Sequence, residues 1–316
     1  MEKFILFSSK SLYRDEFRIN GFRFGEGQKA ACIVGSTRGN EYQQMFTCAK
    51  LVQRLKILEK DDQLVPGREI LVVPCVNTYS MNIHKRFWSI DNTDINRMFP
   101  GYDKGETTQR IAAGLFQQIK DYAIGIQLAS FYMRGIFAPH VRMMHTGFED
   151  VEMAKKFGLP YVIVREPRPF DTTTLNYNWQ LWNAKAFSIY TTTTDHLDPG
   201  SAQHAVDSMV TMLSREGVLK KTAAHPEKLC VTPRLVRDDD LLTIRSPRSG
   251  FFATALRPED QVKKGDIMGR IEDPYDASVR AEITAPEAGT IMFKHGDDMA
   301  YENAVLFKMI TDPEET

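Results

Sequence analysis

Cysteine is scarce in this sequence and forms no C-x-x-C pair. The 316-residue chain contains only Cys32, Cys48, Cys75 and Cys230, which lie far apart. This spacing lacks the paired pattern of common zinc sites and of redox motifs. Isolated cysteines are usually buried thiols. We therefore expect reduced, buried side chains rather than disulfides or metal ligands.

Long hydrophobic runs are also absent. The longest extends from Ile70 to Val76 and already contains Pro74, whereas a membrane-spanning helix needs about 18 apolar residues or more. The first residues, MEKFILFSSKS, hold a four-residue apolar run, too short for a signal-peptide core of about 7–15 residues. We expect a cytoplasmic protein without a membrane partner.

The chain lacks an excess of charge of either sign. Its 40 basic and 41 acidic residues give a formal net charge of -1, which excludes strong electrostatic attraction to nucleic acids or anionic membranes. The hydrophobic share of 42% and the charged share of 26% are ordinary for a globular protein. The length predicts one large domain, or one large and one small domain.

Through the first two thirds of the chain, apolar segments typical of buried strands alternate with helical patterns. Such alternation favours an α/β fold. We expect Ser201 to cap the last helix. The predicted strands are 30–36, 70–76, 124–128 and 161–166, and the predicted helices are 41–58, 107–120 and 201–218.

The pattern changes near residue 225. Beyond it, short apolar stretches separated by glycine and proline predict a small all-β domain. The expected domains are therefore 1–225 and 226–316. Residues 262–271 and 278–291 resemble the biotinyl/lipoyl barrel-sandwich module, with Arg280 where the carrier lysine stands. A guanidinium is not acylated as an amine is, so we expect a structural β domain and no carrier role.

Three segments of the first domain together resemble one family. They are GSTRGNE (35–41), the set Asn77, Arg86 and DINRMFPG (94–101), and IQLAS (126–130). These motifs resemble the succinylglutamate desuccinylase/aspartoacylase family of zinc-dependent deacylases. The resemblance implies a zinc-carboxypeptidase-like mixed sheet flanked by helices, a C-terminal β barrel-sandwich domain, and hydrolysis of N-acyl amino acids.

The resemblance also implies a zinc site, from which this sequence departs. The family's zinc ligands are a His and a Glu in H-G-N-E and a second His in D-L-H. Here Arg38 and Ala129 stand at the two histidine positions, Gln127 replaces the aspartate, and Glu41 is the sole surviving ligand. Arginine stays protonated and offers no lone pair. We therefore expect a degenerate metal site and no cofactor.

The family's general-base glutamate is replaced as well. The most natural alignment of residues 186–200 places Tyr190 there, although Asp195 is an alternative because four threonines allow a shift. Other histidines could in principle rebuild a metal site, but their spacing matches no usual ligand pair. These histidines are His84, His140 and His145.

Arg38 has a second interpretation. Side chains three positions apart at the start of a helix can meet, so its guanidinium could pair with Glu41 and supply the positive charge that zinc supplies in the family. The alternative is a solvent-exposed arginine.

The ligand-binding positions of the family are retained, except that Thr78 replaces a proline. Two arginines near one pocket can hold a carboxylate through charge-assisted bonds. We expect a small acidic ligand, such as an N-acyl amino acid or a dicarboxylate. The alternative is a loop salt bridge from Arg97 to Asp94 or Asp91. The retained positions are Asn77, Arg86, Asn96 and Arg97.

Two functional hypotheses follow. The first is a pseudoenzyme that keeps a carboxylate pocket and acts alone, as a homo-oligomer, or as a heteromer with an active paralogue. The second is an active amidohydrolase with a rebuilt or metal-free site around Arg38, Glu41 and Tyr190.

Overall fold

The computed structural model describes residues 1–10, 15–224, 229 and 232–311, and it contains two compact units. One comprises Met1–Ser130 with Pro139–Leu235, and the other Phe131–Ala138 with Val236–Thr316. The predicted boundary between 225 and 226 lies outside the described residues. The chain enters the second unit after Leu235, and it also contributes residues 131–138, which the sequence did not predict.

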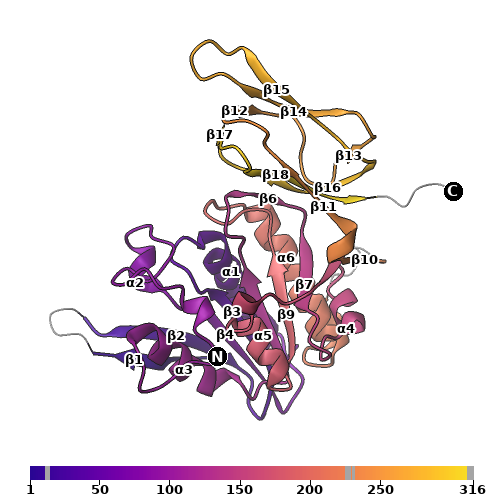
Figure 1. Ribbon diagram of the computed structural model, residues 1–316. Helices are drawn as coiled ribbons and strands as arrows, with labels where there is room; N and C mark the ends of the chain where they lie inside the picture. Colours follow the sequence, from indigo (N-terminus) through magenta and orange to yellow (C-terminus); the bar gives the residue numbers. More distant parts are fainter. Residues whose placement is uncertain (11–14, 225–228, 230–231, 312–316) are drawn as a thin grey trace. The chain divides into compact units, whose positions relative to one another are not determined.

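A nine-stranded mixed sheet forms the centre of the first unit (Figure 1). Its middle strands run parallel. The second strand in the order is antiparallel to both of its neighbours, and the sixth and seventh strands are antiparallel to each other. This confirms the predicted mixed α/β fold. The order is β1 (Glu2–Ser9), β2 (Phe17–Phe24), β4 (Arg68–Cys75), β3 (Gln28–Ser36), β5 (Ile124–Ala129), β9 (Lys185–Tyr190), β7 (His140–Met144), β8 (Tyr161–Arg165) and β10 (Arg234–Arg237).

Helices cover both faces of this sheet and bury a separate apolar core on each. One core lies under α1 (Tyr42–Lys60), α4 (Val151–Lys155) and α6 (Pro199–Arg215). The other lies under α3 (Thr107–Ile119) and α5 (Leu175–Leu181). The connections hold short helices, which are α2 (Thr78–Met81), η1 (Ile95–Arg97), η2 (Pro169–Asp171) and η3 (Lys221–Ala223).

The four predicted strands are β3, β4, β5 and β8, and the three predicted helices are α1, α3 and α6. The predicted cap of α6 is wrong. Asp198 caps this helix by accepting from the backbone N–H of Ser201 at 3.0 Å, and Pro199 occupies the first turn. Proline suits that position because its missing N–H has no partner there anyway.

The second unit contains two antiparallel sheets, which confirms the predicted all-β fold. Arg280 is held by Asp273 Oδ2 at 2.7 Å and by the carbonyl of Ser249 at 2.9 Å. The first sheet is β11 (Leu241–Arg245), β18 (Val305–Thr311), β16 (Gly289–His295) and β13 (Gln261–Val262), with β6 (Gly135–Phe137) paired to β16. The second is β15 (Val279–Thr284), β14 (Ile267–Glu272), β12 (Gly250–Ala253) and β17 (Met299–Ala300).

Three of the cysteines can be compared with the prediction. Cys32, Cys48 and Cys75 are free and buried, as expected, and burial raises the pKa of Cys75 to about 12. Cys230 lies outside the described residues. Within the described part of the chain, no helix combines the length and apolar character needed to cross a membrane.

Candidate functional site

The candidate site lies where three parallel strands end. Strands β3, β5 and β9 are parallel neighbours, so their carboxyl ends meet at one edge of the sheet, the usual ligand-binding edge of α/β folds. Residues 37–41 follow β3, Ser130 follows β5, and Tyr190 ends β9. The sequence motifs thus converge on one place.

The loop after β3 needs a glycine. A Cβ atom at Gly39 would lie 2.3 Å from the carbonyl oxygen of Lys85, which no side chain can tolerate. The backbone N–H of Gly39 also donates to the carbonyl of Arg86 at 2.9 Å. This close approach, possible only without a side chain, brings the backbone of Arg86 next to the loop that carries Arg38.

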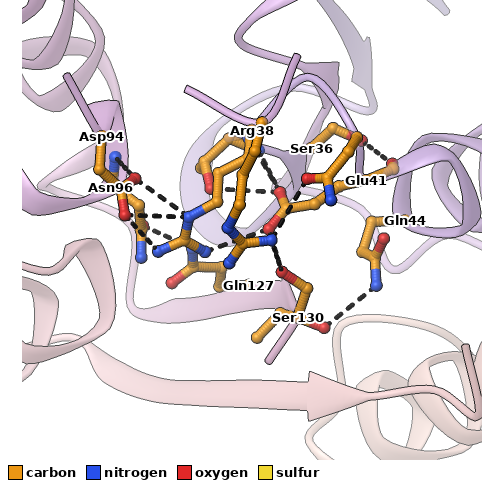
Figure 2. Close-up of polar contacts among 12 residues, drawn as sticks. Ser36, Arg38, Glu41, Gln44, Asp94, Asn96, Gln127 and Ser130 are labelled. Carbon is orange, nitrogen blue, oxygen red and sulfur yellow. Dashed lines mark hydrogen bonds and ion pairs between the residues drawn. The ribbon is translucent and has the colours of Figure 1, made fainter. Parts of the chain in front are cut away.

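Glu41 is fully buried, and donors occupy both of its carboxylate oxygens (Figure 2). Oε2 accepts from the backbone N–H groups of Thr37 and Arg38 at 2.8 and 3.0 Å. Oε1 accepts from Arg38 Nη1 at 3.1 Å and from Ser130 Oγ at 2.5 Å. Such partners compensate the cost of burying a carboxylate.

Arg38 lies between two carboxylates. Besides its contact with Glu41, it donates to Asp94 through Nε at 3.0 Å and Nη2 at 2.9 Å, a bidentate and charge-assisted arrangement. The side chain is 8% exposed. The predicted contact with Glu41 is therefore present, and the solvent-exposed alternative is wrong. Burial lowers the pKa of Arg38, but Asp94 and Glu41 together raise it above its usual value.

Asp94 has a larger role than the sequence suggested. It caps η1 by accepting from the backbone N–H of Asn96 at 3.0 Å. The ion pair with Arg97 exists, with 3.6 Å between Nε and Oδ2, but Arg97 is 44% exposed. Arg38 is the closer partner. In the sequence, the contact between Arg38 and Asp94 could have been expected from Asp94 itself, the acidic first residue of DINRMFPG, which suggested only a pair with Arg97.

Arg86 has only neutral partners. Nη1 donates to Asn40 Oδ1 at 3.2 Å and to Ser130 Oγ at 3.4 Å, and no carboxylate of the described residues forms an ion pair with it. Burial lowers the pKa of Arg86 to about 10, and the nearby positive charge of Arg38 lowers it as well. A carboxylate bound beside this partly buried guanidinium would be strongly favoured.

The two predicted asparagines occupy different settings. Asn96 is buried, and its Oδ1 accepts from Gln127 Nε2 at 2.7 Å, so the residue at the family's aspartate position orients Asn96. Asn77 is 1% exposed and caps α2 by accepting from the backbone N–H of Ser80 at 3.2 Å. The structure thus gives Asn77 a role in shaping the chain before Arg86.

Tyr190 is buried at the end of β9, directly beside Ala129 in the strand register. His140 stacks on its ring with centroids 4.6 Å apart. The guanidinium carbon of Arg142 lies 4.4 Å from the same ring. Asp195, the alternative for this position, lies in the following loop with Oδ1 2.9 Å from His196 Nδ1.

These residues do not fit a zinc ion. Arg38 and Ala129 offer no lone pair, and donors already occupy both oxygens of Glu41. In the described ranges, no three His, Cys, Asp or Glu side chains are grouped to hold a metal ion. The three histidines have separate contacts, which are His84 with Tyr42, His140 with Tyr190 and His145 with Glu149.

The family model of the succinylglutamate desuccinylase/aspartoacylase catalytic domain matches residues 27–189. The chain belongs to the succinylglutamate desuccinylase/aspartoacylase family. The matched region of this family member includes Arg38, Glu41, Arg86 and Asp94, and it ends one residue before Tyr190.

Relatives of this family member include a deacetylase. The N-alpha-acetyl-L-2,4-diaminobutyric acid deacetylase of Halomonas elongata is 24% identical over 266 residues, which are 79% of this chain and 72% of that protein. A succinylglutamate desuccinylase/aspartoacylase structure from Rhodobacter sphaeroides has a TM-score of 0.77 at 17% identity, covering 95% of this chain and 90% of that one. The product-bound ectoine utilization protein EutE (DoeB) from Ruegeria pomeroyi has a TM-score of 0.74 at 19% identity, with coverages of 95% and 92%. The structural likenesses show the fold.

Proposed function

We propose that this family member binds a small carboxylic acid without holding zinc and without hydrolysing an amide bond. The observation that carries the proposal is the guanidinium of Arg38, which bridges Glu41 and Asp94. We call the group formed by these three residues with Arg86 and Arg97 the arginine cluster. Its three guanidinium groups and two carboxylates leave one net positive charge, which suits an anionic ligand.

Hydrolysis of an amide requires an activated water, and this cluster offers little to activate one. A guanidinium carries charge but has no lone pair, so it can neither coordinate a water nor accept its proton. Glu41 could accept a proton only by giving up its bonds to Arg38 and Ser130. We align Tyr190, with Asp195 as the alternative, to the family's general-base glutamate, and a phenol lacks the carboxylate that accepts the proton there.

Binding of a carboxylate needs only what the cluster retains. Arg86 carries a positive charge and contacts only neutral groups, so a ligand carboxylate would supply its missing counter-charge. Asn96 is held in place by Gln127, and Arg97 lies at the exposed side of Asp94. Both can add hydrogen bonds from neighbouring positions.

Amide hydrolysis remains the second candidate function, because the chain belongs to a deacylase family and its relative from Halomonas elongata is named a deacetylase. In that case Tyr190 would act as the acid or base, a role that tyrosine takes in some enzymes. The two candidates differ in whether free amine is released from an N-acyl amino acid.

Metal analysis and an amine-release assay separate these functions. After dialysis against trace zinc, we expect far less than one zinc ion per chain by elemental analysis, because Arg38 and Ala129 cannot act as ligands. We expect no release of amine from a panel of N-acyl amino acids. Stoichiometric, chelator-sensitive zinc would contradict the proposal. Zinc-independent release that Tyr190→Phe abolishes would establish the second candidate.

The proposal also predicts how binding depends on pH. A carboxylate binds the charged form of Arg86, whose pKa is lowered to about 10. The affinity for a carboxylate should therefore stay constant from about pH 7 to 9. Above about pH 10 the affinity should fall, and the decrease should approach tenfold for each further pH unit. Calorimetric titration with acetate, at pH values where circular dichroism shows a folded protein, measures this. A decline that begins near pH 7 would show that another group controls binding.

A further inference from the structure

A cavity of about 660 Å³ lies between β1 and α3, which are neighbours in the first unit (Figure 1). Its volume is in the range of small-molecule sites, about 300–1,000 Å³. We call it the α3 cavity. Its walls are residues 7–9 and 100–103, one face of α3, and Trp182. Strand β1 is an edge of the sheet, whereas β3, β5 and β9 lie in its middle, so the cavity is separate from the arginine cluster.

Small residues of α3 create the hollow. Four of the α3 residues that line it recur at intervals of three and four positions, so they form one stripe of the helix. A Cβ atom at Gly114 would lie 2.2 Å from the ring of Phe7, although glycine is unfavourable inside a helix. Glycine here lets the Phe7 ring lie against the helix as a wall of the cavity. The four residues are Arg110, Ala113, Gly114 and Gln117.

The loop that follows Pro100 forms a further wall. A Cβ atom at Gly101 would lie 2.1 Å from the backbone nitrogen of Ala113, and the φ of Gly101 is +89°, a conformation that favours glycine. The backbone N–H of Tyr102 donates to the carbonyl of Gln109 at 3.2 Å. These two contacts hold the loop on α3 and thereby fix the position from which Asp103 lines the cavity.

Aromatic side chains supply the apolar surface of the cavity. Tyr102 and Trp182 are 55% and 44% exposed, and Trp182 packs edge to face on Phe116 with the ring centroids 5.3 Å apart. Covering exposed aromatic surface with an apolar group is favourable, and a second ring adds specific aromatic contacts. The lining therefore favours a ligand with a large apolar group, and an aromatic ring suits it best.

Two charges of opposite sign complete the lining. Arg110 and Asp103 are both exposed, and within the described ranges neither side chain forms an ion pair or a hydrogen bond. They do not reach each other, so a ligand can lie between them. A guanidinium accepts a carboxylate in bidentate geometry, and a carboxylate pairs with an ammonium group. A ligand with a single charge would satisfy only one of the two residues.

We propose that the α3 cavity binds a free α-amino acid with a large apolar side chain. The carboxylate of the ligand contacts Arg110, its ammonium group contacts Asp103, and its side chain packs against Trp182. This inference goes beyond the proposed function and is independent of it, because it uses no residue of the arginine cluster. Each charged contact should raise affinity by about threefold or more, a modest factor because both charges are exposed to solvent.

Tryptophan fluorescence reports binding at this place. Of the three tryptophans, Trp88 and Trp179 are buried, and Trp182 lines the cavity. Selectively excited tryptophan emission of the full-length protein should change when L-phenylalanine is added. Trp182→Phe should remove this change, while calorimetric titration still detects binding. Two analogues test the charges, namely 3-phenylpropionate, which lacks the ammonium group, and phenethylamine, which lacks the carboxylate. We expect L-phenylalanine to bind about threefold or more tightly than either.

Two charge variants separate the contacts. Arg110→Gln should weaken binding of L-phenylalanine and leave that of phenethylamine unchanged. Asp103→Asn should weaken binding of L-phenylalanine and leave that of 3-phenylpropionate unchanged. Both side chains are exposed, so neither change should disturb the fold. Matched controls remove surface charges elsewhere and should change no affinity; they are Arg270→Gln and Asp62→Asn, whose side chains are 50% and 89% exposed.

The carboxylate of an amino acid could also bind Arg86, so Arg86→Gln distinguishes the two sites. This variant should keep the fluorescence response to L-phenylalanine. Loss of the response in Arg86→Gln but not in Arg110→Gln would place the amino acid in the arginine cluster and overturn the inference. Equal affinity for L-phenylalanine and both analogues would overturn it as well, since the cavity would then not distinguish charge. Absence of L-phenylalanine binding by calorimetry would overturn it and leave succinate binding at Arg86 untouched.

Discussion

Replacing Arg38 with alanine is expected to lower the free energy of unfolding by about 3–5 kcal/mol at neutral pH. The change leaves Glu41, which is fully buried, and Asp94, whose side chain is 11% exposed, without the cation that bridges them. Removing one partner of a buried ion pair is costly because the remaining charge stays desolvated. Urea unfolding of the two proteins measures the difference.

The pH dependence of this effect has a defined sign. The pKa of Arg38 is raised in the folded protein, so its stabilisation is complete at every pH below the usual pKa of arginine and is constant near neutrality. In the alanine variant, the carboxylates without a partner favour protonation. The deficit in stability should therefore shrink as the pH falls towards about 5.

A double-mutant cycle isolates the contact between Arg38 and Glu41. Changing Glu41 to glutamine in the Arg38→Ala background removes one of the two carboxylates that need the cation, so the combined loss should be smaller than the sum of the single losses. Arg38→Lys is the matched control, because it keeps the charge but not the fork that contacts both acids. Additive losses would mean that the two side chains do not stabilise each other.

The largest expected effect on binding comes from Arg86→Gln. Hydrogen bonds to charged groups contribute about 1.5–3 kcal/mol each, so carboxylate affinity should fall by at least about tenfold. Because burial lowers the pKa of Arg86, its charge is unfavourable in the ligand-free protein. The variant should thus be as stable as wild type, or slightly more stable, while its melting temperature no longer responds to succinate.

Arg97→Gln is the matched control for that experiment. Its side chain is 44% exposed and lies 3.6 Å from Asp94, so solvent weakens its interactions, and its removal should reduce affinity less than removal of Arg86. An undiminished thermal response to succinate in Arg86→Gln would contradict the proposed binding site.

The parts of the fold that the sequence predicted have strong local patterns. Strands β3 and β4 are apolar runs buried on both faces, and α3 and α6 have clear amphipathic spacing. Strands β1 and β2 were missed because they form an antiparallel edge with alternating exposure. Such strands owe their stability to the neighbours with which they pair, and no short window of sequence shows those neighbours.

The same distinction applies to the site. Arg38 and Glu41 are three residues apart, so their contact could be predicted from helical spacing. Asp94 lies 56 residues from Arg38, and Ser130 lies 89 residues from Glu41. Only the order of the strands in the sheet brings these residues together. Arg142 carried no motif at all, and its position beside Tyr190 depends on the antiparallel register of β7 and β9.

The short strand β6 affects how the chain can be divided. It pairs with β16, and Phe137 lies with its ring centroid 4.7 Å from that of Phe293. These eight residues, Phe131–Ala138, follow Ser130 directly and belong to the second unit. A protein shortened after Leu235 would therefore keep a strand without its partner and an aromatic cluster without its core. Domain exchange between relatives must accordingly transfer two stretches of sequence, and one of them begins next to the residue that binds Glu41.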